Sequence, residues 1–336
     1  MSNNFPKEFK TLTAQCDILI NQRKLKIPES ENRDKALSSL KTQLIKKNYF
    51  DLVNGLEDMI NFADSQHKYY GEYSITDLLE LYKLNKKLRE LLLAEISEFE
   101  IRLKTSIAYH FSEKHSQWND YYNINSYRRV TRNDNNEVFQ ARYGYSKNYQ
   151  GNDPVCNQRL VFPFFMTDRR QIQKLKRRKR YMSAYGGRPP LWVAIKILDF
   201  GQLHIMFSLL TADIAADILS DFNLIPSFRN RFESILYVIN WLRNECAHFE
   251  MINKSRYHGK FAIDAGLINE LNLRTNRSRR NLNLFQSMCI LNSVQEFKLK
   301  FSQLLDDSDI NEQLKRSYLR AIGFWRQCEW DIPIDF

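Results

Sequence analysis

The sequence predicts an all-α fold, and three observations support this prediction. Gly and Pro are scarce, at 10 and 8 of 336 residues, so few tight turns are expected. Apolar residues recur at intervals of three and four along most of the chain, the spacing that gives a helix one apolar face. Hydrophobic residues make up 43% of the chain, which is normal for a protein with a real core. The length corresponds to one large domain or two of ordinary size.

The N-terminal part, residues 1–117, is expected to be helical. Two amphipathic helices are predicted between residues 8 and 66, separated by the polar connector RKLKIPESENRD. A longer helical pattern covers residues 74–115, with Thr76 as its N-cap and a break near Glu80. These segments would pack their apolar faces together.

Residues 118–187 lack sustained helical spacing and are rich in Tyr, Asn, Arg and Gly, which indicates an insertion. Between Arg128 and Arg180 there are 14 Lys/Arg against 4 Asp/Glu, nearly the whole net charge of +11. Clustered cations with interleaved tyrosines are typical of surfaces that hold phosphates and stack bases. A solvated basic loop, or a small aromatic subcore with charged edges, remains an alternative. The binding candidates are Arg128, Arg129, Arg132, Arg142, Lys174, Lys176, Arg177, Arg178, Lys179 and Arg180.

The remaining part, residues 188–336, returns to helical spacing. Pro189 and Pro190 can begin one helix, and Ser227 is a suitable N-cap for a second. Helical spacing recurs at 284–304 and 311–324. The second helix carries one continuous apolar stripe, formed by Phe228, Phe232, Ile235, Leu236, Ile239, Leu242, Cys246 and Phe249.

Near the end of this helix the chain reads Arg243-Asn244-Glu245-Cys246-Ala247-His248. At about 100° per residue, Arg243 lies about 60° from the middle of the apolar stripe and His248 about 160° from it. His248 is therefore not expected in the core. The two side chains are about 140° apart, so one helix does not bring them together. A cleft between two such helices, as in an isologous dimer, would bring Arg and His to one phosphate. Ordinary polar positions on an amphipathic helix are the alternative.

Longer segments of the chain resemble a known family. NWLRNECAHFEMI resembles the Arg-Asn-x-x-Ala-His signature of Abi-like abortive-infection proteins (AbiD/AbiF type), a branch of the HEPN superfamily. The opening segments TAQCDILINQRKL and ALSSLKTQLIKKNYFDLVNG, the long helix with Glu98 and Arg102, and PPLWVAIKILDFGQLHIMFSLL are similar to family segments in the same order. Lys24 stands where the family usually has Gly. The insertion has no recognised counterpart.

The resemblance implies a HEPN-like helical bundle with additional N-terminal helices, dimerisation across the motif helix, metal-independent RNA cleavage, and a role in phage defence or as a toxin. Arg243 and His248 match the catalytic pair, and Asn244 matches the polar residue after the arginine. Neither a metal nor a cofactor is expected. The implied partners are substrate RNA, a second copy of the chain, and an antitoxin that is either a small RNA or a protein. The basic insertion would then contact substrate or regulator.

Two other functions remain open: a non-catalytic RNA-binding module with a residual motif, and a protein–protein role beside a nucleotidyltransferase partner. Glu98 and Arg102 are secondary candidates for the rim of the cleft, and their i,i+4 spacing favours a structural ion pair on the helix surface. The remaining histidines have no partner pattern and are interpreted as structural or exposed. The five widely spaced cysteines indicate neither disulfides nor a zinc site. Without a long apolar run or a signal peptide, the protein is expected in the cytoplasm.

Overall fold

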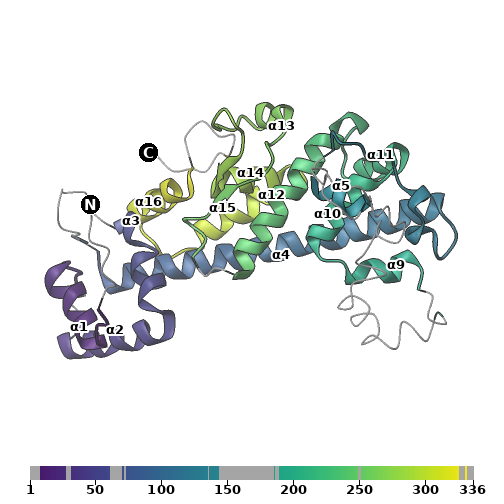
Figure 1. The fold of residues 1–336 in the computed structure, drawn as a ribbon. Coiled ribbons are helices and arrows are strands. Elements are labelled where there is room, and N and C mark those ends of the chain that lie inside the picture. Colours follow the sequence, from purple (N-terminus) through teal and green to yellow (C-terminus); the bar gives the residue numbers. More distant parts are fainter. Residues whose placement is uncertain are drawn as a thin grey trace.

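The computed structural model is built almost entirely of helices, which confirms the all-α prediction (Figure 1). It describes residues 8–27, 32–60, 70–71, 73–134, 136–143, 185, 189–248, 251–324 and 330. The elements of the first half are α1 (Leu12–Asp17), η1 (Ile18–Gln22), α2 (Arg33–Lys47), η2 (Phe50–Asn54), α3 (Glu57–Ile60), α4 (Ile75–Lys114), η3 (Asp120–Tyr122), η4 (Ile124–Ser126) and α5 (Asn136–Tyr143). No described helix has both the length and the apolar character needed to cross a membrane.

The second half contains more elements, and most of them pack on one another or on α4. They are α9 (Leu191–Ala194), η6 (Ile195–Ile197), α10 (Phe200–Leu209), α11 (Ala212–Asp221), η7 (Pro226–Phe228), α12 (Arg229–His248), β1 (Arg256–His258), α13 (Ala265–Glu270), β2 (Asn281–Asn283), α14 (Leu284–Asn292), α15 (Lys298–Asp306) and α16 (Glu312–Ile322).

Helix α4 runs through the molecule as a single 40-residue helix (Figure 1). The break expected near Glu80 is wrong, and so is Thr76 as the N-cap. Ser74 takes that position because its hydroxyl accepts from the Asp77 N–H at 3.3 Å, while Asp77 Oδ2 accepts from the Ser74 N–H at 2.7 Å. This reciprocal pair satisfies the first free amide groups of the helix. The N-terminal helices lie at one end of α4, and α9, α10 and α11 lie towards the other.

The core forms where α4, α10, α11 and α12 meet. Phe99 of α4 lies within 6.0 Å of the Phe200 ring and 5.3 Å of the Phe222 ring, and Phe232 of α12 closes the cluster. These rings are all buried. Aromatic pairs at such distances add stabilisation beyond the area they bury, so this cluster fixes α12 against α4.

The first part of the insertion is ordered around two buried tyrosines. The Tyr121 hydroxyl donates to the Pro189 carbonyl at 2.8 Å, and the Tyr127 hydroxyl donates to the Tyr121 carbonyl at 2.9 Å. For these two tyrosines the structure therefore shows the aromatic subcore. Helix α5 packs on α10. Tyr145 and Tyr149 lie outside the described residues.

Three predicted boundaries in the second half are wrong. The segment after Pro190 is divided into α9, η6 and α10, because Asp199 caps α10 through the N–H of Gln202 at 2.9 Å. Ser227 lies inside the 3₁₀ turn η7 and does not cap α12. The 284–304 pattern is two helices, α14 and α15. Asn292 separates them because its side-chain oxygen accepts from the N–H groups of residues 297 and 298. The pattern at 311–324 is confirmed as α16, capped by Asn311.

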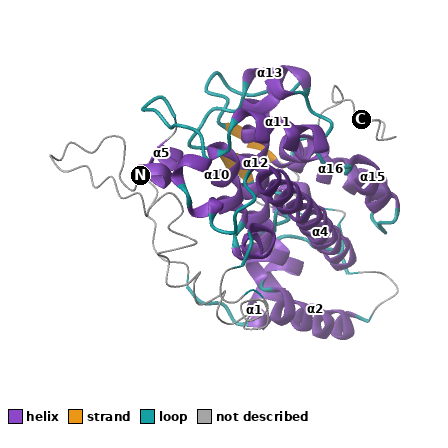
Figure 2. Cartoon of the chain, turned by 90° about the vertical axis from the view of Figure 1, so that its right-hand side faces the viewer, coloured by secondary structure: helices purple, strands orange, loops and turns teal. Residues whose placement is uncertain are grey.

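A short antiparallel ribbon joins α12 to α14, as the orange strands of Figure 2 show. Strands β1 and β2 pair Tyr257 with Leu282, and these two side chains are buried while most of their neighbours are exposed. The sequence did not predict this ribbon, because three residues are too few for a recognisable alternation. The ribbon holds the loop before β2 beside the segment that follows α12.

Candidate functional site

The site predicted from the motif lies at the C-terminal end of α12. This helix packs on α4, α10 and α14. The predicted stripe is buried from Phe232 to Cys246, and Val238 extends it. Phe228 is half-buried in η7, and Phe249 lies outside the described residues. The apolar face thus fixes which side of α12 is turned to solvent.

The three motif side chains lie off this apolar face. Asn244 and His248 are exposed, and His248 is the last residue of α12. Arg243 is half-buried, and its Nη1 donates to Asn244 Oδ1 at 3.2 Å. Among the described residues, His248 has neither a hydrogen-bond nor an ionic partner. The prediction that His248 is not a core histidine is confirmed, and its ring is available to a ligand.

A buried polar network anchors the chain just beyond the motif. The Asn253 N–H donates to Asn85 Oδ1 at 3.1 Å, and the Asn253 side-chain amide donates to the Gly55 carbonyl at 3.0 Å. The Tyr318 hydroxyl donates to the same Asn85 oxygen at 3.4 Å. Asn85 and Asn253 are both fully buried. Because buried amides need partners, this network fixes the chain after α12 against α4 and the η2–α3 turn.

The two residues inside the motif have structural roles. Glu245 Oε2 accepts from the Ser255 hydroxyl at 2.7 Å and so ties the last turn of α12 to the segment before β1. Burial raises the pKa of Cys246 to about 12. Its thiol therefore stays protonated near neutral pH and does not serve as a nucleophile.

The structure places the predicted basic residues in different environments. Arg128 is half-buried: its Nε donates to the Ser208 carbonyl at 2.6 Å, and its Nη2 lies 2.5 Å from Asp134 Oδ1. The Arg128 guanidinium thus braces the insertion against α10. Arg129 and Arg132 are exposed. The side chain of Arg142 lies outside the described residues, as do Lys174, Lys176, Arg177, Arg178, Lys179 and Arg180.

A second basic segment escaped the sequence analysis. Between α13 and β2, the stretch LRTNRSRRN carries four arginines and no acidic residue. In the part of the chain that the structure describes, none of their guanidinium groups forms an ion pair. The loop itself is fixed, since the carbonyls of Arg279 and Arg280 accept from the N–H groups of Ile263 and Gly259. We call Arg274, Arg277, Arg279 and Arg280 the arginine loop. Charge counted in short windows would have revealed it.

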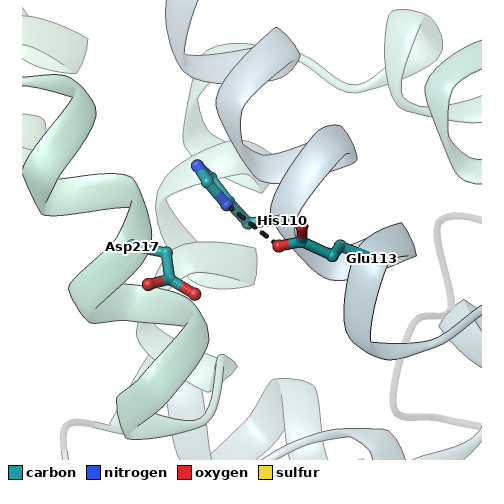
Figure 3. A group of neighbouring side chains, drawn as sticks. All are labelled: His110, Glu113 and Asp217. Atoms are coloured by element: carbon teal, nitrogen blue, oxygen red, sulfur yellow. Dashed lines mark ion pairs between the residues drawn. The ribbon is translucent and has the colours of Figure 1, made fainter.

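Helices α4 and α11 share a cluster of His110, Glu113 and Asp217 (Figure 3). One ligand atom from each lies within 4.8 Å of the others, a spacing that suits a metal ion. Existing contacts already use these groups. His110 Nε2 lies 3.0 Å from Asp221 Oδ2, and Lys114 Nζ lies 3.9 Å from Asp217 Oδ2. The cluster therefore serves to join α11 to α4.

Glu98 and Arg102 do not form the expected ion pair. The Arg102 guanidinium instead donates to the Asp221 carbonyl and lies 4.3 Å from the centre of the Phe222 ring. Glu98 accepts from Gln295 at 3.3 Å. Tertiary partners therefore replace the helical i,i+4 contact. Both residues hold neighbouring helices on α4, away from the motif.

The comparisons with known proteins place the chain in a family. The family model described as Abi-like protein matches residues 42–253, more than half of the chain, and the match includes the motif helix. No curated protein and no solved structure matches the chain. The chain therefore belongs to the Abi-like protein family, a membership that indicates a role in abortive infection.

Proposed function

We propose that this protein is a metal-independent endoribonuclease of the HEPN type, which acts as a toxin-like effector in abortive infection. One observation carries the proposal: Asn244 and His248 are exposed at the end of α12, with Arg243 bonded beside them. The anchoring network around Asn253 holds this end of the helix in place. An exposed histidine without a structural partner, next to an arginine that can bind phosphate, suits RNA cleavage.

The chemistry needs no cofactor. The 2′-hydroxyl of one nucleotide attacks the adjacent phosphorus, and the 5′-oxygen of the next nucleotide leaves. His248 removes the 2′ proton or supplies the proton that the leaving oxygen requires. The Arg243 guanidinium, always charged, stabilises the negative charge on the phosphorane oxygens. Asn244 orients the scissile phosphate or the imidazole. The products are a 2′,3′-cyclic phosphate and a 5′-hydroxyl.

A dimer supplies what one helix lacks. Arg243 and His248 leave α12 on different sides and make no contact with each other within the chain. Two copies of α12 that meet around a twofold axis would place an arginine from one protomer near a histidine from the other. The same arrangement provides one histidine as base and one as acid.

The decisive experiment is cleavage of single-stranded RNA in EDTA, with the product ends identified by mass spectrometry. We expect cyclic phosphate ends with the wild type. His248→Ala should lower the rate by a factor of 100 or more, on the scale of lost acid–base catalysis. Arg243→Ala should act similarly, while Arg243→Lys retains part of the activity. His115→Ala, a matched substitution at the far end of α4, should cut normally. Cleavage that requires a metal, or 3′-hydroxyl products, would contradict the mechanism.

The second candidate is a non-catalytic RNA-binding module, which the arginine loop favours, since its four guanidinium groups form no ion pair with any described residue. Expression in a bacterial host distinguishes the two functions. A toxic wild type with a tolerated His248→Ala variant supports the ribonuclease. Equal tolerance of both, with salt-dependent RNA binding that is lost when Lys176 to Arg180 are neutralised, supports the module. An antitoxin, either RNA or protein, would restrain the toxic form.

A further inference from the structure

An open pocket lies beside α12, on the ribbon side of the molecule. Its volume is about 430 Å³, within the range of sites for small ligands. Three segments far apart in the sequence form its walls: residues 128–138, the first half of α12, and the loop 261–265. Arg279 of the arginine loop also lines it. None of these residues belongs to the motif.

One wall of the pocket is aromatic. The rings of Tyr237 and Phe261 lie 5.1 Å apart with a tilt of 41°, and both side chains are half-buried. Tyr257 lies beneath them and is buried. Half-buried rings at a pocket wall leave a face or an edge open to a flat ligand. Stacking of a base on such a ring is worth about 1–3 kcal/mol.

The charges that line the pocket leave an excess of positive charge on the arginine loop. Its three carboxylates are each engaged by an arginine. The ion pairs are Asp134–Arg128 at 2.5 Å, Glu233–Arg229 at 3.5 Å and Asp264–Arg231 at 3.5 Å. Among the lining residues, Arg279 is the cation with no acidic partner, and the exposed Arg277 and Arg280 flank it in sequence. Paired charges in the pocket beside the arginines of the arginine loop suit a ligand with a flat, uncharged part and an attached anion.

The pocket and His248 lie on the same side of α12. At about 100° per residue, one face of the helix, about 80° wide, carries Asn230, Glu233, Tyr237, Trp241, Asn244 and His248. Trp241 stands between the pocket and the motif. Its ring packs edge-on against Tyr257 at 5.5 Å and is half-buried. From Tyr237 to His248 the helix rises about 16 Å, a distance that a few nucleotides can span.

We propose that this pocket binds one unpaired base of a single-stranded RNA, while the arginine loop holds the adjoining phosphates. The base stacks on the Tyr237–Phe261 wall, and the strand then follows this face of α12 past the half-buried Trp241 to the exposed Asn244 and His248. The ligand class rests on the proposed function, because RNA is the substrate assigned to the motif. A base enters such a pocket only when it is unstacked from its neighbours, so duplex RNA is excluded.

Equilibrium binding tests this proposal in the full chain with His248→Ala, which prevents cleavage. The probe is a labelled single-stranded RNA of mixed sequence. Phe261→Leu removes the ring but keeps apolar volume, and we expect binding about tenfold weaker. Phe261→Tyr restores a ring and should bind as tightly as the parent. Duplex RNA of the same length should bind more weakly than the single strand.

The phosphate part of the proposal has its own matched pair of variants. Arg277→Gln with Arg280→Gln should weaken binding and reduce the slope of log K against log salt by about 1.4, the value for two lost single-strand phosphate contacts. Lys35→Gln with Lys46→Gln removes the same charge from exposed positions of α2, which lies at the N-terminal end of α4 (Figure 1). This control should keep the parent slope. Excess nucleoside monophosphate that displaces the RNA completely would instead identify a free-nucleotide site and overturn the strand path.

The outcomes separate this inference from the proposed function. The proposed RNA site is contradicted if Phe261→Leu binds RNA as tightly as the parent, or if the arginine and lysine pairs change the binding equally. This holds even if the wild type cuts RNA. If the wild type binds RNA through the pocket but never cuts it, the ribonuclease proposal is contradicted and the RNA-binding role of the pocket is retained. A protein that binds no RNA at any salt concentration overturns both.

Discussion

The backbone N–H of Asn253 donates to the side-chain oxygen of Asn85 at 3.1 Å, across 168 residues of sequence. Both residues are fully buried, so this bond replaces water that neither group can reach. It joins the chain just beyond the motif to the long helix that supports it. The position of His248 thus depends on a contact that involves no residue of the motif.

Asn85→Ala should destabilise the protein by about 1–3 kcal/mol, because the Asn253 N–H and the Tyr318 hydroxyl both lose an acceptor. Urea unfolding measures this change. Cleavage should fall as well, since the end of α12 loses its anchor. Asn269→Ala, at an exposed position of α13, is the control and should change stability by less than about 0.5 kcal/mol. Wild-type stability in Asn85→Ala would show that the network is dispensable.

The neighbours Arg128 and Arg129 should respond differently to replacement by alanine. Arg128→Ala removes one of the donors to the Ser208 carbonyl and the ion-pair partner of Asp134, and should cost about 1–3 kcal/mol. Arg129→Ala and Arg132→Ala remove exposed side chains and should alter stability by less than about 0.5 kcal/mol. Thermal unfolding and RNA binding are measured on all three. A stable Arg128→Ala variant that binds RNA weakly would show that Arg128 acts as a phosphate ligand.

His204 should make the protein sensitive to acid. It is buried beside Tyr237, and burial lowers its pKa from 6.5 to about 3. The unfolded chain therefore binds a proton at pH values where the folded protein does not. Above pH 6.5 the protonation of His204 does not reduce the free energy of unfolding. As the pH drops from 6.5 towards 3, this free energy falls by up to about 1.4 kcal/mol per pH unit. The loss from pH 6.5 to pH 5 should be smaller in His204→Phe. Equal losses in urea titrations would contradict this assignment.

Dimerisation should control cleavage. Ala247 is exposed between Arg243 and His248, and Ala247→Glu places a negative charge where two copies of α12 and the RNA phosphates would meet. We expect a folded monomer with little cleavage, and wild-type activity per protomer that falls on dilution together with the dimer fraction. Sedimentation velocity and rate measurements over one concentration series check both. A dilute monomer that cuts at the full rate would refute the composite site.

The sequence predicts what depends on periodicity and misses what depends on tertiary contacts. The apolar stripe of α12 and the exposure of His248 follow from 100° per residue alone. Ser74 in place of Thr76, and the partners of Arg102, depend on which groups meet after folding. The β1–β2 ribbon is too short to leave a pattern, and it is this ribbon that fixes the arginine loop near α12.

The packing of α12 affects when the motif helix can fold fully during synthesis. The motif helix ends at residue 248, yet it packs on α14, which begins at residue 284. The side-chain oxygen of Asn85, which anchors the chain beyond the motif, also accepts from the Tyr318 hydroxyl. A nascent chain that has just completed the motif therefore lacks part of its support. Since domains fold as units during synthesis, the motif helix gains its full packing only after α14 and Tyr318 have been made. The proposed ribonuclease would then stay inactive until α14 and Tyr318 have been made.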